Sequence, residues 1–203
     1  MILDLPDRDF AGYIFDCDGT LVDSMPLHFR AWNASFRHHG APFEWTEERF
    51  YAGAGVPDRE IVAALNAEFD CDLDGDAVHD FKAAWFVDHL TELTAVAAVA
   101  EIVRDLHARG AAMAVATGSD LAIVDPELRH VGLRHFFEII VTPKDVKRGK
   151  PAPDMFLLAA EKLGVAPAGC LVFEDGQAGL QAAEAAGMAS VFVPSAPAPT
   201  RQG

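Results

Sequence analysis

Two aspartates, Asp16 and Asp18, lie two positions apart, directly after a short apolar run and just before Gly19. If that run is a buried strand, both carboxylates lie at its carboxyl end, where open α/β sheets bind their ligands. Carboxylates this close resist ionisation unless a cation neutralises them or one of them keeps a proton. The pair therefore suits metal binding and acid/base chemistry, although an isolated pair of this kind is more often a strand-to-loop junction that caps a helix.

Three further segments carry groups that could handle a phosphate, and each also follows an apolar run. Thr117, Gly118 and Ser119 offer hydroxyls and backbone N–H groups for phosphoryl oxygens, and Lys150 offers one positive charge beside a proline-rich loop. The acidic pair Glu174–Asp175 provides the hard oxygen ligands that Mg²⁺ prefers. Singly, these segments could be a helix cap, a charged loop and an acidic helix start, but together they predict one site at one sheet edge.

Short apolar runs predict the strands that must position these groups, and helical patterns lie between the later runs. The predicted strands are Tyr13–Phe15, Ala112–Ala116, Phe137–Val141, Cys170–Phe173 and a fifth at Ser190–Val193. The predicted helices are Ala98–Arg109, Asp125–Val131 with Pro126 in its first turn, Asp154–Leu163 and Gln177–Ala186, with Gly110, Gly132, Gly164 and Gly187 just after their ends. Strands that alternate with single helices favour right-handed crossovers, so we expect an α/β, Rossmann-like core with a mostly parallel sheet.

The stretch from Val22 to Leu93 breaks this alternation, because it holds no convincing apolar strand. It is predicted to form an inserted helical subdomain of residues 22–93, which leaves residues 1–21 and 94–203 for the α/β core. Its predicted helices are Pro26–His39, Glu47–Phe50, Asp58–Glu68 and Asp76–Glu92.

Composition and charge exclude several classes of function. The chain has 203 residues, 51% hydrophobic and 23% charged, which is too apolar for a disordered chain and too charged for a membrane protein. Its formal net charge of −15 repels nucleic acid and anionic lipid, so we expect neither as a partner. Three cysteines without metal-ligand spacing, and no visible signal peptide or spanning segment, favour a cytoplasmic protein, and we take a monomer as the default.

The four motifs, taken together, resemble those of the haloacid-dehalogenase-like phosphohydrolases, in the group of the β-phosphoglucomutases and fructose-1-phosphate phosphatases. The resemblance covers essentially the whole chain. It implies that Asp16 is the nucleophile and Asp18 the general acid/base, and that the segment 22–93 is a cap. It further implies that Thr117, Gly118 and Lys150 hold the phosphoryl group, and that Asp16, the main-chain carbonyl of Asp18, Glu174 and Asp175 bind Mg²⁺.

The resemblance implies a Mg²⁺-dependent phosphatase that hydrolyses a small, fructose-1-phosphate-like sugar phosphate through an aspartyl-phosphate. Asp18 favours phosphate-ester chemistry, because dehalogenases and phosphonate-cleaving relatives lack that aspartate. A β-phosphoglucomutase is the alternative, but where such relatives carry a basic residue two positions after a Gly-Val turn this chain has Asp58, with Arg59 one position later. This departure favours the phosphatase, and a non-catalytic metabolite-binding protein is a third reading.

Three residues of the predicted cap, His28, Arg59 and Lys82, are candidates for contact with the substrate. They come from three different helical segments and would converge over the site in a closed cap. Each has a simpler alternative, since His28 could pack or cap a helix and the other two could lie on solvated helix faces.

Overall fold

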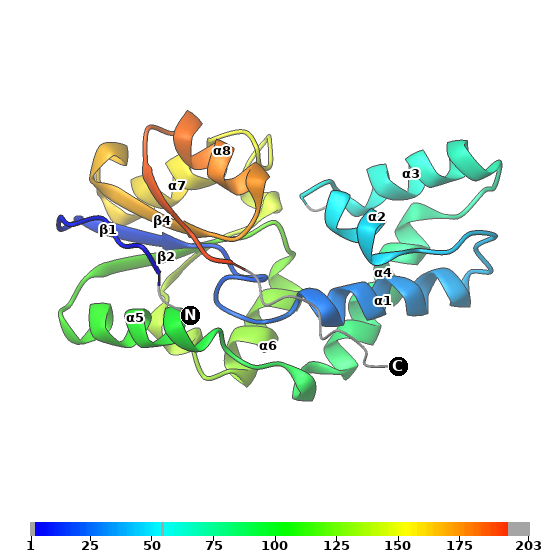
Figure 1. Cartoon of the computed structure of the whole chain (residues 1–203), viewed down its shortest axis with the longest axis horizontal. Coiled ribbons are helices and arrows are strands. Elements are labelled where there is room, and N and C mark those ends of the chain that lie inside the picture. Colours follow the sequence, from blue (N-terminus) through cyan, green and yellow to red (C-terminus); the bar gives the residue numbers. More distant parts are fainter. Residues whose placement is uncertain (1–2, 54, 195–203) are drawn as a thin grey trace. The chain divides into compact units, whose positions relative to one another are not determined.

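Five strands form one parallel sheet in the order β3-β2-β1-β4-β5, as drawn in the computed structural model of Figure 1. The structure describes residues 3–53 and 55–194. Residues 1–2 and 195–203 of the predicted core domain therefore lie outside the described residues. The strands are β1 (Gly12–Phe15), β2 (Ala112–Ala116), β3 (Ile139–Val141), β4 (Cys170–Glu174) and β5 (Ala189–Phe192). The predicted α/β class with a parallel sheet is confirmed.

Helices cover both faces of the sheet, which explains why its central strands are apolar along their whole length. The helices α7 (Asp154–Leu163) and α8 (Gln177–Ala185) lie on one face, and α5 (Ala97–Ala108) and α6 (Leu121–His130) lie on the other (Figure 1). Short 3₁₀ turns occupy Arg134–Phe136, Pro143–Asp145 and Pro167–Gly169. All residues of β1 and β4 are buried, and the ring of Phe15 stacks on that of Phe173 with centroids 4.7 Å apart.

The predicted helix ends are confirmed on the carboxyl side of the core helices. The four glycines expected there, Gly110, Gly132, Gly164 and Gly187, all have a positive φ of 68–73°. This left-handed conformation stops a helix, and a glycine adopts it without the steric cost that a side chain would add.

The predicted start of α6 was wrong. The helix begins at Leu121, four residues before the expected Asp125, and Pro126 lies inside it. Proline has no N–H group, so the carbonyl four residues before Pro126, that of Ala122, lacks its helical hydrogen-bond donor. Ala122 is exposed, so water can satisfy that carbonyl and the helix continues through the proline. The predicted strand Phe137–Val141 is also shorter than expected, because it starts at Ile139.

The chain divides into two compact units, of which Met25–Glu92 is one and the remainder of the chain the other. The smaller unit is helical, with α1 (Met25–His38), α2 (Glu47–Ala52), α3 (Asp58–Phe69), α4 (Gly75–Asp88) and a 3₁₀ turn at Leu90–Glu92. The predicted helix Asp76–Glu92 therefore ends early, at Asp88. The unit has its own apolar core, in which Trp32, Phe36 and Trp45 pack against one another.

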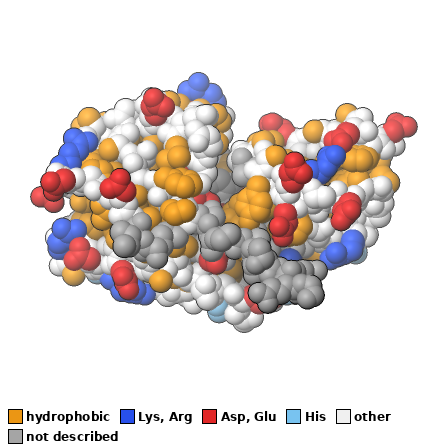
Figure 2. Space-filling model, viewed as in Figure 1, with side chains coloured by type: hydrophobic (Ala, Val, Ile, Leu, Met, Phe, Trp, Pro, Cys, Tyr) orange, Lys and Arg blue, Asp and Glu red, His pale blue; other side chains and the backbone are white. Residues whose placement is uncertain are grey.

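The visible surface mixes charged and apolar side chains. On the face drawn in Figure 2, acidic and basic groups are interspersed over both units rather than gathered into one patch. Among the helices that the structure describes, none is long and apolar enough to cross a membrane.

Candidate functional site

The predicted site residues of the core lie where neighbouring strands end together. The parallel register pairs Phe15 with both Val115 and Phe173, so β1, β2 and β4 reach the same edge. The backbone N–H of Asp16 extends the ladder by donating to the carbonyl of Phe173 at 3.0 Å. Asp16 therefore lies next to Glu174, the last residue of β4.

Lys150 joins these two carboxylates. Its Nζ donates to Asp16 Oδ1 at 2.6 Å and to Glu174 Oε2 at 2.7 Å, and the three side chains are each at least nine-tenths buried. The loop before α7 brings Lys150 to this point, and the ring of Phe156 on α7 lies 5.0 Å from Nζ. Burial strengthens these contacts, because water does not screen them.

One lysine does not offset the acidic charge of this cluster. Burial, and then the charge of Glu174, raise the pKa of Asp16 to about 8, although Lys150 acts in the opposite direction. Burial also raises the pKa of Glu174. For Lys150, burial opposes the charged form, but the two carboxylates outweigh it and raise the pKa of the ammonium group. A further positive charge at the site would therefore stabilise the ionised carboxylates.

Asp175 completes an acidic cluster with Asp16 and Glu174, each of which offers an oxygen within 4.8 Å of the others. Two glycines make room for these side chains. A Cβ on Gly19, which has a φ of +77°, would lie 2.1 Å from Asp175 Oδ2, and a Cβ on Gly179 would lie 2.0 Å from Cδ of Glu174. Both glycines are therefore sterically required while the carboxylates keep these positions.

Two hydroxyl groups hold the carboxyl of Asp18. Ser24 Oγ donates to its Oδ1 at 2.7 Å, and Ser119 Oγ donates to its Oδ2. Hydrogen bonds from neutral hydroxyls fix the orientation of the carboxyl without the charge of a bound lysine. Asp16 and Asp18 thus have different surroundings, which is what two separate chemical duties require.

The second motif follows β2 at the same edge. The N–H of Thr117 donates to the carbonyl of Val141, and its buried Oγ1 accepts the N–H of Ser119 at 3.0 Å. Gly118 is exposed, and nothing lies within 4 Å of where its Cβ would be. This turn leaves open space above Gly118 at the end of the strand.

Comparison with known proteins identifies the family. A family model described as haloacid dehalogenase-like hydrolase matches residues 10–187 of the chain. The chain belongs to the haloacid dehalogenase-like hydrolases. It is 40% identical to the fructose-1-phosphate phosphatase YqaB of Escherichia coli, over 91% of this chain and 96% of that protein.

Solved structures of other proteins have a similar fold. The structure is similar to CbbY from Rhodobacter sphaeroides in complex with phosphate, with a TM-score of 0.84 and 28% identity over 96% of this chain and 89% of that one. It is also similar to a putative β-phosphoglucomutase from Thermotoga maritima, with a TM-score of 0.66 and 31% identity over 87% and 82% of the two chains.

The three residues predicted to contact substrate all lie in the unit Met25–Glu92, and each has a contact inside that unit. The ring of His28 stacks on Phe86 with centroids 4.1 Å apart. Arg59 is largely exposed and pairs with Asp76.

Lys82 is buried, and its partners belong to the same unit. Its Nζ pairs with Asp58 and lies 4.6 Å from the centroid of the Trp32 ring. Burial opposes ionisation of Asp58, but the hydrogen bond from His79 and the charge of Lys82 outweigh it and lower the pKa of Asp58 to about 2. A substrate that bound Lys82 would therefore compete with a firmly ionised carboxylate.

Several residues of this haloacid dehalogenase-like site have no role predicted from the sequence. Ser24 holds Asp18, and Phe156 lies against Lys150. Ser119, predicted as a phosphate-handling group, donates its hydroxyl to Asp18. Glu127 is fully buried on α6 and accepts a hydrogen bond from the thiol of Cys17 at 3.6 Å. An acidic residue in the apolar stripe of Ile123, Val124 and Leu128 was the available signal for Glu127, but the expected start of the helix at Asp125 hid that stripe.

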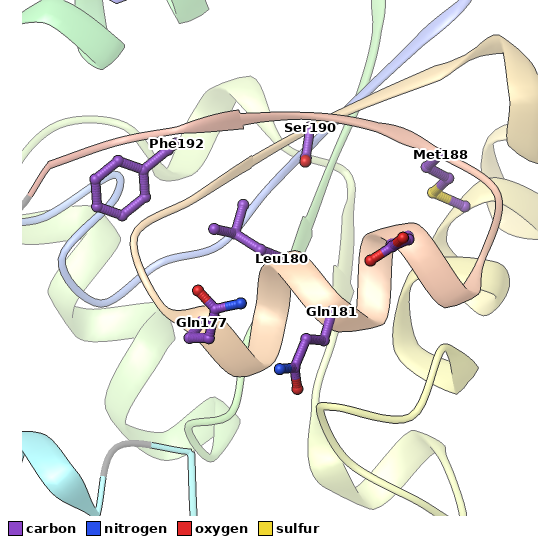
Figure 3. Close-up of a pocket in the computed structure, with 7 residues that line it drawn as sticks. Gln177, Leu180, Gln181, Met188, Ser190 and Phe192 are labelled. Atoms are coloured by element: carbon purple, nitrogen blue, oxygen red, sulfur yellow. The ribbon is translucent and has the colours of Figure 1, made fainter.

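A surface hollow of about 460 Å³ lies between α8 and the edge strand β5 (Figure 3). Gln177, Leu180, Gln181, Glu184, Met188, Ser190 and Phe192 line it. None of the predicted site residues is among them, and apart from Glu184 the polar groups are neutral. The predicted acidic residues lie in the cluster of Asp16, Glu174 and Asp175, not in this hollow.

Proposed function

We propose that this haloacid dehalogenase-like hydrolase is a Mg²⁺-dependent phosphatase that hydrolyses a small, fructose-1-phosphate-like sugar phosphate through an aspartyl-phosphate intermediate. The observation that carries the proposal is the contact of Lys150 with both Asp16 and Glu174 at one sheet edge, beside Asp175. The names of the relatives support the substrate class.

The residues fit a magnesium ion. Three carboxylates with oxygens within 4.8 Å of one another form a hard donor set. Burial, and then neighbouring acidic charge, raise the pKa values of Asp16 and Glu174, and Lys150 alone does not offset these effects. Asp16, Glu174, Asp175 and the main-chain carbonyl of Asp18 would hold the ion. When bound, Mg²⁺ supplies positive charge against the phosphoryl oxygens and keeps the neighbouring carboxylates ionised.

The proposed reaction has two steps, in which Asp16 and Asp18 have different roles. In the first, a carboxylate oxygen of Asp16 attacks phosphorus, the bond from phosphorus to the sugar oxygen breaks, and Asp18 gives that oxygen a proton. In the second, the ionised Asp18 takes a proton from water, whose oxygen attacks phosphorus and releases phosphate from Asp16. Lys150, Thr117 and the N–H of Gly118 would hold the phosphoryl oxygens during both steps.

The helical unit Met25–Glu92 would act as the cap that selects the sugar. We keep His28, Arg59 and Lys82 as the proposed substrate contacts, with the added requirement that a substrate at Lys82 displaces or shares Asp58. We also propose that the enzyme is a monomer and that it is cytoplasmic. The three free cysteines support only the location.

A β-phosphoglucomutase is the second candidate, and the similarity to a putative member of that group favours it. Such an enzyme transfers phosphate between positions of the sugar and releases little to water. The acidic Asp58, where a basic residue is expected after the Gly-Val turn, argues for the phosphatase.

The test is Mg²⁺-dependent phosphate release from a panel of hexose, pentose and triose phosphates, with β-glucose 1-phosphate and a bisphosphate primer run alongside. We expect release from one or a few sugar phosphates, and a loss of at least about 1,000-fold in Asp16→Asn, because the nucleophile is removed. Asp105→Asn, the same change at an exposed residue of α5, is the matched control.

The other outcomes separate the remaining readings. Conversion to glucose 6-phosphate with little release would identify a mutase. Full activity in EDTA would contradict the magnesium assignment, and turnover of no sugar phosphate would leave a metabolite-binding protein.

A further inference from the structure

Glu127 is a fully buried acidic residue that the proposed mechanism does not use. Its Oε2 accepts a hydrogen bond from Cys17 Sγ at 3.6 Å, and its Oε1 has no hydrogen-bond partner among the described residues. Within the same described part of the chain, it forms no ion pair with a lysine or arginine. A carboxyl buried in this way destabilises a fold relative to an apolar side chain of similar size, so packing alone does not account for it.

The thiol that donates to Glu127 belongs to Cys17, which lies between the two aspartates of the first motif. The carbonyl of Cys17 accepts the N–H groups of Leu21 at 2.8 Å and Val22 at 3.0 Å, so the turn after β1 closes on this residue. The Cys17 thiol connects that turn to Glu127 on α6. Both side chains are fully buried, which keeps water from replacing the contact.

The carboxyl of Asp18 faces the same buried acid. Asp18 and Ser24 both interact with the Glu127 carboxyl. The Ser24 hydroxyl also donates to Asp18 Oδ1 at 2.7 Å. Glu127 therefore lies behind the general acid/base, in contact with the turn that carries it.

We propose that Glu127 is a positioning residue that holds the turn from Asp16 to Asp18, and thereby the orientation of the Asp18 carboxyl, through its contact with Cys17. The kinetic part of this inference rests on the proposed phosphatase function. Asp18 must point at the leaving oxygen in one step and at water in the next, and a well-placed general acid/base contributes about 10²–10⁴-fold to such a reaction. A loosened turn loses part of that factor without weakening phosphate binding.

The experiment compares Glu127→Met, which replaces the carboxyl by an apolar chain of similar length, with the conservative Glu127→Gln. Leu128→Met, at the neighbouring fully buried position of α6, is the matched control for repacking. For each variant we would measure the melting temperature, kcat and KM for the best sugar phosphate, and the conformation of Asp18 in a crystal structure.

We expect Glu127→Met to be as thermostable as the parent or more so, because a partly unsatisfied buried carboxyl is removed. Its kcat should fall about tenfold while KM stays within about twofold, and its Asp18 should leave the hydroxyls of Ser24 and Ser119. Glu127→Gln keeps an acceptor for the Cys17 thiol, so its kcat should stay within about threefold of the parent.

Parental kcat in Glu127→Met, or a lowered melting temperature with an unmoved Asp18, would show a merely structural role and overturn the inference. So would a loss of kcat in Glu127→Gln as large as that in Glu127→Met. If the parent itself turns over no sugar phosphate, the proposed function fails. The crystal structures then still decide whether Glu127 positions Asp18.

Discussion

As the proposed nucleophile, Asp16 is subject to opposing requirements, because attack needs the anion whereas burial and Glu174 favour the neutral acid. With Lys150 in place and no metal ion bound, its pKa rises from 3.8 to about 8 in the folded chain. Between these two values the folded state binds more protons than the unfolded state. The contribution of Asp16 to the free energy of unfolding therefore falls as pH rises from about 4 to about 8, and stays level above that.

Magnesium binding should depend on pH for the same reason. The ion must displace the proton from Asp16, so we expect the Mg²⁺ concentration at half-saturation to fall as pH rises from 6 to 8, by up to about tenfold per pH unit for one proton released. The rise in melting temperature on adding Mg²⁺, measured at several pH values, checks this.

Asp16→Asn is the control for this pH dependence, because asparagine has no proton to lose in this range. It should bind Mg²⁺ more weakly and with a flatter pH profile than the parent. Equal half-saturation at pH 6 and pH 8 in the parent would contradict the account.

At the scale of elements, the start of α8 and the end of β4 meet at Gly179. A Cβ there would lie 2.0 Å from Cδ of Glu174, so Gly179→Ala must push the Glu174 carboxylate away from Lys150. We expect Mg²⁺ affinity or turnover to fall about 10–100-fold, the usual cost of misplacing a group that orients a metal ligand. Mg²⁺-dependent phosphate release and Mg²⁺ titration measure it.

Gly149→Ala is the control for the effect of a glycine substitution as such. Nothing lies within 4 Å of the added Cβ, and the backbone of Gly149 is not in the left-handed region. It should keep the activity of the parent. An active Gly179→Ala with parental Mg²⁺ affinity would mean that Glu174 can move without consequence.

How much of the fold could be predicted from the sequence also depends on the type of element. The apolar runs gave the sheet, because parallel strands buried on both faces have few polar positions. Strands that end in register then bring Asp16 and Glu174 together, as in β1 and β4. The start of α6 was not predictable from Pro126, since whether a helix tolerates a proline depends on whether the freed carbonyl meets solvent.

The partners of individual side chains could not be predicted in the same way. Lys82 pairs with Asp58 across two helices, and Arg59 pairs with Asp76. Such pairs depend on how α3 and α4 pack, which the spacing of residues along one chain does not specify. The hydroxyls on Asp18 come from Ser24 and Ser119, about one hundred positions apart in the sequence, for the same reason.

At the scale of the whole molecule, the net charge of −15 works against the proposed substrate. A sugar phosphate carries a charge of about −2 at neutral pH. The long-range field therefore repels the substrate on approach, and attraction begins only near Lys150 and a bound cation. The interspersed charges seen in Figure 2 provide no broad basic surface on that face to steer the approach.

Salt should therefore raise the rate at which the enzyme captures its substrate. Raising the ionic strength from 0.01 M to 0.15 M shortens the screening length from about 30 Å to about 8 Å, which weakens the repulsion from distant acidic residues more than it weakens contacts in the buried site. We expect kcat/KM to rise a few-fold over this range at saturating Mg²⁺, mostly through a lower KM. Choline chloride should act like sodium chloride if screening is the cause. A fall of kcat/KM with salt would instead mean that local positive charge dominates the approach, and that the excess acidic residues lie too far from the site to affect it.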